Sequence, residues 1–372
     1  MSIAVSIATL AASGASSSYG ELLAFRSLNG FFGGVSLGLG SATVCDLFFE
    51  HERGLYMGIY TVSLISGGHL APIVGGYIEK SLTWRWCFNI PSIIHAVILP
   101  VFILTVPETL YPHGQLEKDY RPFQSWMHNM TMRGKIHPVR RLRLVDFLRP
   151  LQMLQYPSVL LPTIYYMVSF AWGSILFIIS SANVFAKTYH YKPYQTGVLL
   201  GTPLTVGSVL GELISGAFSD WISNRRALAR NGVRKPEDRL LALPPAIILI
   251  PLGIIIEGVC IERKSQPIGA AMGIAIASFG LQIATTVVYT YTNECYRQQA
   301  AELGTLLNFS RQMFSFCVGF YAVQLGEKIG FQNAWIVFAF VNFAVSLPVL
   351  LLIVKGEQWR NMLGPVNFHS DL

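Results

Sequence analysis

The sequence GIYTVSLISGGHLAPIVGG at residues 58–76 decides the fold that we expect for this chain. Each glycine costs a water-soluble helix roughly 1 kcal/mol and a proline about 3 kcal/mol, yet the stretch is long and apolar enough to cross a bilayer. In a membrane, glycines let helix backbones approach closely, and proline fixes a bend whose freed carbonyl is satisfied by neighbouring groups. The stretch therefore predicts a bent membrane-spanning helix that packs tightly against other helices.

Composition extends this prediction to the whole chain. Of the 372 residues, 52% are hydrophobic and 13% are charged, whereas about 25% are charged in an ordinary soluble domain. Apolar runs of about 20 residues predict an all-α polytopic membrane protein with ten spans. The predicted spans are residues 2–19, 21–45, 55–79, 88–107, 157–182, 195–219, 240–261, 267–290, 302–324 and 332–355.

The net charge of +7 does not indicate a nucleic-acid partner, because of where the basic residues lie. With the N-terminus placed in the cytoplasm, 18 of the 27 Lys and Arg residues fall in inner segments and seven in outer connections, while Arg26 and Arg311 fall within spans. This distribution satisfies the positive-inside rule with both termini cytoplasmic. The first segment ends in small residues like a cleaved signal peptide, but it lacks the positive n-region of one, so we expect a span there.

Nothing in the sequence indicates catalytic or metal chemistry. It shows no HExxH motif, no paired histidines and no nucleophile motif, so we expect neither an enzyme nor a bound metal or cofactor. The five cysteines lie in or at the ends of spans without paired spacing, so we expect packing residues rather than a disulfide framework or a zinc site. They are Cys45, Cys87, Cys260, Cys295 and Cys317.

Several motifs resemble those of one transporter family. The stretch at 58–76 resembles the antiporter motif on the fifth helix of proton-coupled exporters in the major facilitator superfamily, with alanine replacing one of the usual glycines. The segments CDLFFEHERGLYMGIY, WRWCFNIP, VPETLYP and FLRPLQMLQYPSVLLP look like those of fungal drug:proton antiporters that export drugs or metabolites. The resemblance implies a major facilitator fold, whose two halves rock about a midplane site. It assigns the antiporter motif to Gly58, Gly67, Ala71, Pro72, Gly75 and Gly76.

The polar segment at residues 108–156 divides the predicted spans into four and six. We therefore expect a first half at residues 1–107, a cytoplasmic loop at 108–156, and a six-helix second half with a short tail at 157–372. The resemblance implies that the chain begins at the family's third helix. An incomplete gene model, helices supplied in trans and a degenerate protein are three explanations that the sequence leaves open.

Arg26 is a charged residue inside the second predicted span. An unpaired charge there costs roughly 2.5–3.5 kcal/mol on insertion scales, so we expect a partner or a watery cavity. Arg26, Asn29 and Gly30 resemble the family's fourth-helix motif, whose arginine is linked to proton transfer. The alternative is that Arg26 snorkels to the outer headgroups beside Glu21.

Glu212 is the second ionisable residue inside a span, and it shares a helical face with Ser208 and Gly216. A carboxyl group held away from bulk water can load and release protons near neutral pH, which suits proton coupling. The alternative is that Glu212 pairs with a loop arginine near the inner surface.

Gly216 and Asp220, followed by Arg225 and Arg226, resemble in part the loop motif between the family's eighth and ninth helices. The match is partial because Trp221 replaces the expected basic residue. An aspartate at a helix end that faces arginines can form an inner gate, whose salt bridges break as the two halves rock. Otherwise these charges only anchor the inner surface.

Arg311 lies in the middle of a span and needs a partner. Glu294 aligns with an acidic residue in fungal members of the family, and we expect a structural pair or a gate network here rather than substrate binding. Glu257, His69 and His95 are single ionisable residues within spans. We expect a histidine on such a helix to hydrogen-bond a neighbour rather than to carry a proton.

The fifth predicted span carries four aromatic residues: Tyr165, Tyr166, Phe170 and Trp172. They could line a cavity for a planar apolar substrate. Periodicity does not separate lining positions from lipid-facing positions, so both interpretations stay open.

The resemblance implies proton-coupled efflux of a small organic molecule, such as a drug, a toxin or a secondary metabolite, by alternating access. The expected partners are that substrate, protons and the lipid bilayer, in the plasma membrane or alternatively the vacuolar membrane. A facilitated importer of a small nutrient shares the fold and is a second hypothesis. A degenerate or non-transporting membrane protein is a third.

Overall fold

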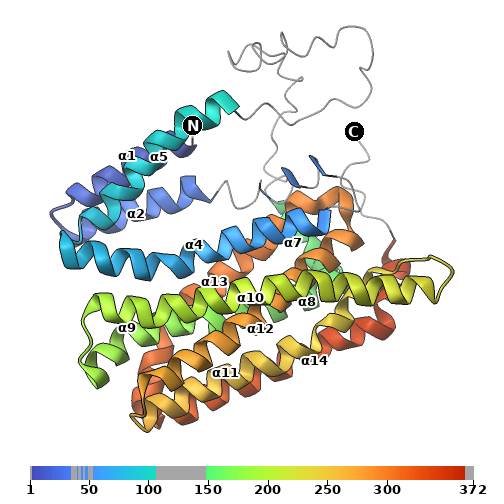
Figure 1. Ribbon diagram of the computed structural model, residues 1–372. Helices are drawn as coiled ribbons and strands as arrows, with labels where there is room; N and C mark the ends of the chain where they lie inside the picture. Colours follow the sequence, from blue (N-terminus) through green and yellow to red (C-terminus); the bar gives the residue numbers. More distant parts are fainter. Residues whose placement is uncertain are drawn as a thin grey trace. The chain divides into compact units, whose positions relative to one another are not determined.

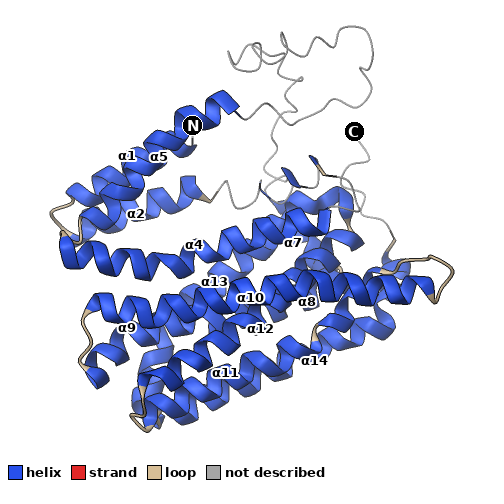
Figure 2. Ribbon diagram, in the orientation of Figure 1, coloured by secondary structure: helices blue, strands red, loops and turns tan. Residues whose placement is uncertain are grey.

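The structure is a computed structural model, and it describes residues 2–34, 40, 43–44, 47–48, 53–105 and 148–364. Every regular element within these ranges is a helix (Figures 1 and 2). The chain forms two compact units, Met1–Ser36 with Leu82–Leu148, and Leu37–Ser81 with Arg149–Leu372. We call them the smaller unit and the larger unit.

The smaller unit holds α1 (Ser2–Ala15), α2 (Tyr19–Gly33) and α5 (Trp86–Thr105), and α1 packs against the other two. Asn29 on α2 donates hydrogen bonds from Nδ2 to Ser6 Oγ at 2.9 Å and to Thr9 Oγ1 at 3.1 Å. Ser92 Oγ on α5 donates to the carbonyl oxygen of Ile7 at 2.9 Å. Polar side chains therefore join these apolar helices, as is common between helices in a membrane.

The larger unit begins with α4 (Arg53–Ser81) and continues from residue 149. Several helices of the larger unit begin with proline, because proline fits the first turn of a helix, where its missing N–H leaves no hydrogen bond unmade. Its further elements are α7 (Arg149–Gln152), η2 (Met153–Gln155), α8 (Pro157–Phe170), η3 (Ala171–Ile175), α9 (Leu176–Tyr189), α10 (Pro193–Leu228), η4 (Pro236–Ala242), α11 (Pro244–Glu262), α12 (Pro267–Cys295), η5 (Arg297–Gln299), α13 (Ala300–Ile329) and α14 (Phe331–Leu363).

Each of the ten predicted spans overlaps a helix in the part of the chain that the structure describes. Six helical stretches there are long and apolar enough to cross a membrane: Trp86–Leu104, Pro157–Ser181, Pro193–Leu228, Pro236–Glu262, Pro267–Cys295 and Phe331–Leu363. The predicted all-α membrane fold is confirmed at this level. The loop predicted at 108–156 falls outside the described residues as far as residue 147, as do Cys45 and the segment VPETLYP. The division into halves at residues 107 and 157 stays a prediction.

Helix ends differ from the predicted spans where polar residues continue a helix beyond its apolar part. Helix α10 was expected to end at residue 219 and continues to Leu228, since no glycine or proline interrupts the chain before Gly232. Helix α12 likewise continues past residue 290 to Cys295. Hydropathy marks the lipid-facing part of a helix, whereas the helix itself continues until a capping or helix-breaking residue ends it.

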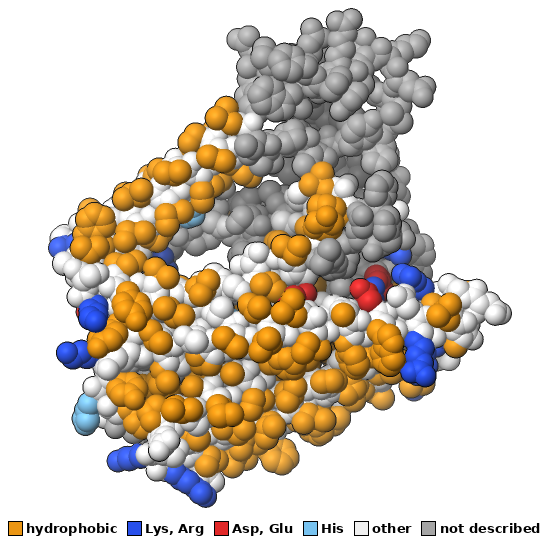
Figure 3. All heavy atoms as spheres, viewed as in Figure 1, with side chains coloured by type: hydrophobic (Ala, Val, Ile, Leu, Met, Phe, Trp, Pro, Cys, Tyr) orange, Lys and Arg blue, Asp and Glu red, His pale blue; other side chains and the backbone are white. Residues whose placement is uncertain are grey.

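Large aromatic side chains fill the interior of the larger unit. Trp335, Tyr165, Tyr166, Tyr289 and Phe177 are all fully buried. On the visible outer face of this unit, hydrophobic side chains cover the middle of the helices, while Lys and Arg side chains lie toward the two helix ends (Figure 3). This distribution fits helices whose middle meets lipid and whose ends meet water.

Candidate functional site

Helix α4 packs against α10 along a seam at which glycines let the two backbones approach closely. Later residues of α4 contact earlier residues of α10, so the two helices are antiparallel. A Cβ atom added to Gly76 would lie 2.8 Å from the Cα atom of Tyr194, and one added to Gly201 would lie 2.7 Å from the carbonyl oxygen of His69. Such distances leave room only for glycine, so the tight packing predicted for residues 58–76 is confirmed at these positions.

Pro72 takes part in the same seam, which we define by Gly76, Pro72 and His69 on α4 and by Tyr194, Gly197 and Gly201 on α10. A Cβ atom on Gly197 would collide with the carbonyl oxygen of Pro72 and would lie 3.0 Å from its carbonyl carbon. Two other motif glycines are different, because a Cβ atom on Gly67 or Gly75 would meet no heavy atom within 4 Å among the described residues. Ala71 is exposed as well.

His69 joins the seam to two further helices through hydrogen bonds. Its Nε2 atom lies 3.0 Å from Ser174 Oγ in η3, and its Nδ1 atom lies 2.9 Å from Ser208 Oγ on α10. Ser208 Oγ in turn lies 2.9 Å from Ser278 Oγ on α12. All four side chains are buried. The expectation that this histidine bonds a neighbour is confirmed, and the network ties α4 to the core of the larger unit.

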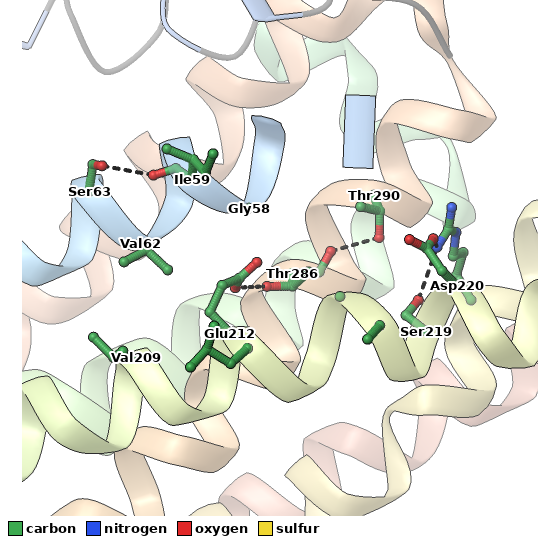
Figure 4. Close-up of a pocket in the computed structure, with 14 residues that line it drawn as sticks. Gly58, Ile59, Val62, Ser63, Val209, Glu212, Ser219, Asp220, Thr286 and Thr290 are labelled. Carbon is green, nitrogen blue, oxygen red and sulfur yellow. Dashed lines mark hydrogen bonds and ion pairs between the residues drawn. The ribbon is translucent and has the colours of Figure 1, made fainter. Parts of the chain in front are cut away.

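Further along the same two helices, the seam gives way to a pocket of about 510 Å³ (Figure 4). Its wall combines apolar side chains with two carboxylates, one arginine and several hydroxyl groups. The lining residues are Gly58, Ile59, Val62 and Ser63 on α4; Val209, Glu212, Leu213, Gly216, Ala217, Ser219 and Asp220 on α10; Arg239 in η4; and Thr286 and Thr290 on α12.

Glu212 is the carboxylate in the middle of the pocket wall. Its Oε2 atom accepts a hydrogen bond from Gln282 Nε2 on α12 at 2.7 Å. It also accepts one from Thr286 Oγ1 on the same helix at 2.5 Å (Figure 4). Its Oε1 atom lies against the Cα atom of Gly58 on α4. The contacts described for Glu212 come from neutral groups, so the alternative of a pair with a loop arginine finds no support in them.

A cluster of ions lies at the Asp220 end of the pocket. Arg239 donates from Nη1 to Asp220 Oδ1 and, at 3.3 Å, to Ser219 Oγ. It also donates from Nε and Nη2 to Glu294 Oε1 at 3.1 and 3.0 Å. Arg239 therefore joins two residues that sequence analysis selected separately as gate candidates, although it was not itself selected.

The short helix η4 positions Arg239 by holding three consecutive charged residues in buried places. Glu237 accepts from Arg360 Nε at 3.0 Å, and Asp238 accepts from Arg230 Nη1 at 2.8 Å. Glu237, Asp238 and Arg239 are each buried. The sequence signal that could have identified Arg239 is PEDR at residues 236–239. A proline begins a short turn there, and its three charged residues can be buried only if each has a partner.

Comparison with known proteins decides the family. The sequence matches the Major Facilitator Superfamily over residues 1–320. The chain belongs to this superfamily. It is 28% identical over 348 residues to the efflux pump radE of Floropilus chiversii, covering 91% of this chain and 64% of that protein. It is also 28% identical over 352 residues to the MFS-type transporter penM of Penicillium rubens, covering 92% of this chain and 67% of that protein.

Solved structures show the same fold at low sequence identity. The proton:xylose symporter XylE matches with a TM-score of 0.62 at 14% identity, covering 95% of this chain and 79% of the other. The human organic anion transporter MFSD10 matches with a TM-score of 0.58 at 17% identity, covering 92% and 75%. The chain spans 64% of the length of the efflux pump radE.

The arginines after Asp220 in this major facilitator protein lie apart from the ion cluster. The Arg225 guanidinium lies 5.4 Å from the centre of the Trp221 ring, and Arg225 and Arg226 are both exposed. The structure thus pairs Asp220 with Arg239, from the other end of the loop, rather than with these two residues.

Arg311 on α13 is buried and contacts aromatic side chains. Its Nη1 atom donates to the Tyr166 hydroxyl at 3.2 Å, and its guanidinium lies 4.3 Å from the centre of the Phe170 ring. Glu294, which sequence analysis discussed together with Arg311, belongs to the Arg239 cluster instead. Arg311 therefore stands in a separate network of cation–π and hydroxyl contacts.

The four aromatic cavity candidates are all buried in the larger unit, and none of them lines the pocket at Glu212. Trp172 donates from Nε1 to the Tyr321 hydroxyl at 3.0 Å and stacks on Phe338 at 5.1 Å. Tyr165 is fully buried. Their burial excludes a lipid-facing position, whereas a role in substrate binding stays a prediction.

Arg26 lies in the smaller unit, on an exposed part of α2. Its guanidinium lies 5.5 Å from the centre of the Phe88 ring on α5. Glu21 does not serve as its described partner, because the Glu21 carboxylate caps α2 by accepting from Ser17 Oγ at 3.0 Å and from the Ser17 backbone N–H at 2.9 Å. The proposed role of Arg26 in proton transfer stays a prediction.

Sequence analysis named Glu257 only as a single ionisable residue, and the structure gives it two defined partners. Glu257 is fully buried on α11, where it accepts from Trp335 Nε1 at 2.5 Å and from Ser180 Oγ at 3.2 Å. No group of three His, Cys, Asp or Glu side chains that could hold a metal ion occurs among the described residues.

Proposed function

We propose that this chain exports a small organic molecule in exchange for protons by alternating access. The observation that carries the proposal is the pocket next to the α4–α10 seam, with Glu212 in its wall. A volume of about 510 Å³ lies within the range of small-molecule sites. An ionisable residue inside a membrane span is costly and therefore marks a functional position.

The predicted topology orients this pocket. With Arg53 on the inner side, the Gly58 end of α4 lies toward the cytoplasm and the Gly76 end lies toward the outside. The seam then closes the outer part of the contact between α4 and α10, and the pocket occupies the inner part. We propose that the pocket takes substrate from the cytoplasmic side.

The Arg239 cluster fits the proposed inner gate. Asp220 ends the pocket, and Arg239 holds it together with Glu294 on another helix. Ion pairs of this kind are either formed or broken, because water solvates the charged groups once they separate. We propose that the cluster rearranges when the two halves, at residues 1–107 and 157–372, rock about the pocket.

The direction of transport rests on the relatives. The protein radE is named an efflux pump, and the resemblance of residues 58–76 to the antiporter motif points the same way. The proposed location is the plasma membrane, where export removes a compound from the cell.

Accumulation of fluorescent compounds in a drug-sensitive yeast tests the proposal. Cells that express the chain are expected to accumulate less of at least one compound from a panel that includes Nile red and ethidium, and a protonophore is expected to remove the difference. The Glu212→Gln variant is expected to behave like cells without the protein. A matched control is Glu327→Gln, because Glu327 is exposed and pairs with Lys187 away from the pocket. Unchanged, protonophore-insensitive accumulation over the whole panel contradicts the proposal.

A further inference from the structure

We infer that Arg311 is the centre of a binding site for the carboxylate group of a small aromatic acid, inside the larger unit between α8, α12 and α13. The inference rests on the proposed function and names its substrate class. It follows from a buried positive charge for which the described part of the chain supplies no negative partner.

The guanidinium of Arg311 is a buried cation with neutral partners. Only 4% of the surface of Arg311 is exposed. Its Nη1 atom donates to the Tyr166 hydroxyl at 3.2 Å, and the centre of the Phe170 ring lies 4.3 Å from the guanidinium. Within the described ranges, no ion pair joins Arg311 to an acidic side chain. A buried charge without a counter-ion is costly, so an anion from outside the chain would stabilise it.

The acidic side chains of the neighbouring helices are held by other groups. Glu212 and Glu257 accept hydrogen bonds from neutral side chains, and Glu294 belongs to the Arg239 cluster. None of the contacts described for these three carboxylates involves Arg311. The counter-ion of Arg311 therefore does not come from them.

One edge of the Arg311 guanidinium suits a carboxylate. The described hydrogen bond uses Nη1, whereas Nε is buried and has no hydrogen-bond partner among the described residues. Nε and Nη2 lie on the same edge of the planar group. Two N–H donors side by side match the two oxygen atoms of a carboxylate in geometry as well as in charge.

Two buried hydroxyl groups in the same region also lack partners. The Tyr289 hydroxyl has none among the described residues, and its ring packs edge-on against Tyr166 with 5.6 Å between the ring centres. Ser315, one turn after Arg311 on the same face of α13, has a buried Oγ atom that likewise bonds to no described residue. Buried polar groups are normally hydrogen-bonded, so these donors fit an acceptor with more than one oxygen atom.

Aromatic rings surround these donors. Phe170 lies over the guanidinium, and its ring centre is 6.2 Å from that of Tyr166, which contacts Tyr289. Aromatic rings bury a large apolar area and pack well edge to face, so an aromatic acid would gain more here than a small aliphatic acid. An organic cation would meet like charge at Arg311 and is disfavoured at this position.

The site lies close to the pocket of the proposed function, although Arg311 does not line that pocket. Tyr289 lies on α12 between Thr286 and Thr290, which both line it. Because Arg311 is buried, a ligand reaches it only when the surrounding helices move apart, as alternating access requires.

Binding of 2-naphthoate to the full chain in lipid nanodiscs tests the inference. The neutral compound 2-naphthamide is the matched probe, and empty nanodiscs give the blank. We expect the acid to bind at least tenfold more tightly than the amide. Arg311→Gln is expected to remove this preference, whereas Arg263→Gln, at an exposed arginine that follows α11, keeps it. Chloride at the same concentration as the acid is expected not to displace it.

A second variant changes the site without removing a described contact. Tyr289→Phe deletes a hydroxyl that has no partner among the described residues, so the melting temperature should change little. Binding of the acid is expected to weaken about threefold or more, because the hydroxyl would donate to the carboxylate. Tyr296→Phe is the control, since it deletes a buried hydroxyl that also lacks a described partner, at the end of α12.

The wild-type measurements need no variant, so they decide the inference even if Arg311→Gln does not fold. Equal binding of acid and amide overturns it, as does displacement by equimolar chloride, which would show a site for small inorganic anions. A preference for the acid that Arg311→Gln keeps, or acid binding that Tyr289→Phe leaves unchanged, also overturns it. If compounds of the yeast panel are still exported in a proton-dependent way, the proposed function stands and only the substrate class is wrong.

Discussion

Gly58 on α4 lies against the carboxylate of Glu212 on α10, so closely that a Cβ atom at position 58 would collide with Glu212 Oε1. A glycine of the antiporter motif and an acidic residue more than 150 positions later therefore form one wall of the pocket. This relationship connects the antiporter motif to the proposed proton site, and substitutions that add or remove a few atoms can test it.

The first prediction concerns this contact. Gly58→Ala is expected to displace the Glu212 side chain and to lower transport at least tenfold, because its hydrogen bonds to Gln282 and Thr286 depend on its position. The matched control is Gly67→Ala on the same helix, where no heavy atom lies within 4 Å of an added Cβ atom among the described residues. Efflux assays on both variants at equal expression decide it. Equal activity of the two variants would contradict the assigned role of Gly58.

The second prediction concerns the seam. Gly201→Ala is expected to lower the free energy of unfolding by about 1–3 kcal/mol, because a methyl group there pushes α4 and α10 apart. Gly216→Ala on the same helix serves as the control, since no heavy atom of the residues that the structure describes lies within 4 Å of a Cβ atom at that position. Thermal denaturation of the purified proteins measures the difference. A Gly201→Ala protein as stable as the Gly216→Ala protein would show that the seam tolerates a wider spacing.

The third prediction concerns the ion cluster. Arg239→Gln leaves Asp220 and Glu294 close together without a cation, so we expect at least a tenfold loss of transport together with greater labelling of cysteines placed in the pocket. Arg263→Gln is the control, because Arg263 is exposed at the end of α11. Wild-type transport by Arg239→Gln would remove the cluster from the proposed gate.

The fourth prediction concerns Glu257, whose carboxyl group is fully buried. Trp335→Phe removes the indole N–H that Glu257 accepts from and is expected to cost about 1–3 kcal/mol of stability. Trp221→Phe provides the comparison, because Trp221 is exposed on α10 and should change the melting temperature little. Equal melting temperatures of the two variants would mean that the Trp335 bond contributes nothing.

The sequence was sufficient for much of the fold. Each of the ten spans predicted from hydropathy overlaps a helix in the described part of the chain. The glycines and proline at 58–76 predicted a tightly packed helix, because those residues are costly unless another backbone needs the space. The partner of that helix was not predictable. Gly197 and Gly201 on α10 look like any other small residues in a span until the structure sets them against Pro72 and His69.

Of the residues that line the pocket, sequence analysis selected the carboxylates Glu212 and Asp220 and the glycines Gly58 and Gly216. Glu212, Asp220 and Glu294 were selected because charge within or beside an apolar span stands out. Gln282 and Thr286 carry no charge and gave no such signal. The sequence does not distinguish Arg239 from the other basic residues among the six in 220–239. It is the turn beginning at Pro236 that makes Arg239 the partner of Asp220. Pairing across helices depends on tertiary packing, which spacing along the chain does not encode.

The most direct test of the central claim, proton-coupled transport through Glu212, is flux in proteoliposomes that contain the purified full chain and a fluorescent substrate found in the yeast panel. An imposed pH gradient is expected to drive that substrate uphill in the wild-type protein, and Glu212→Gln is expected to abolish uphill movement. Uphill, proton-driven transport by Glu212→Gln, at the wild-type rate, would contradict the account.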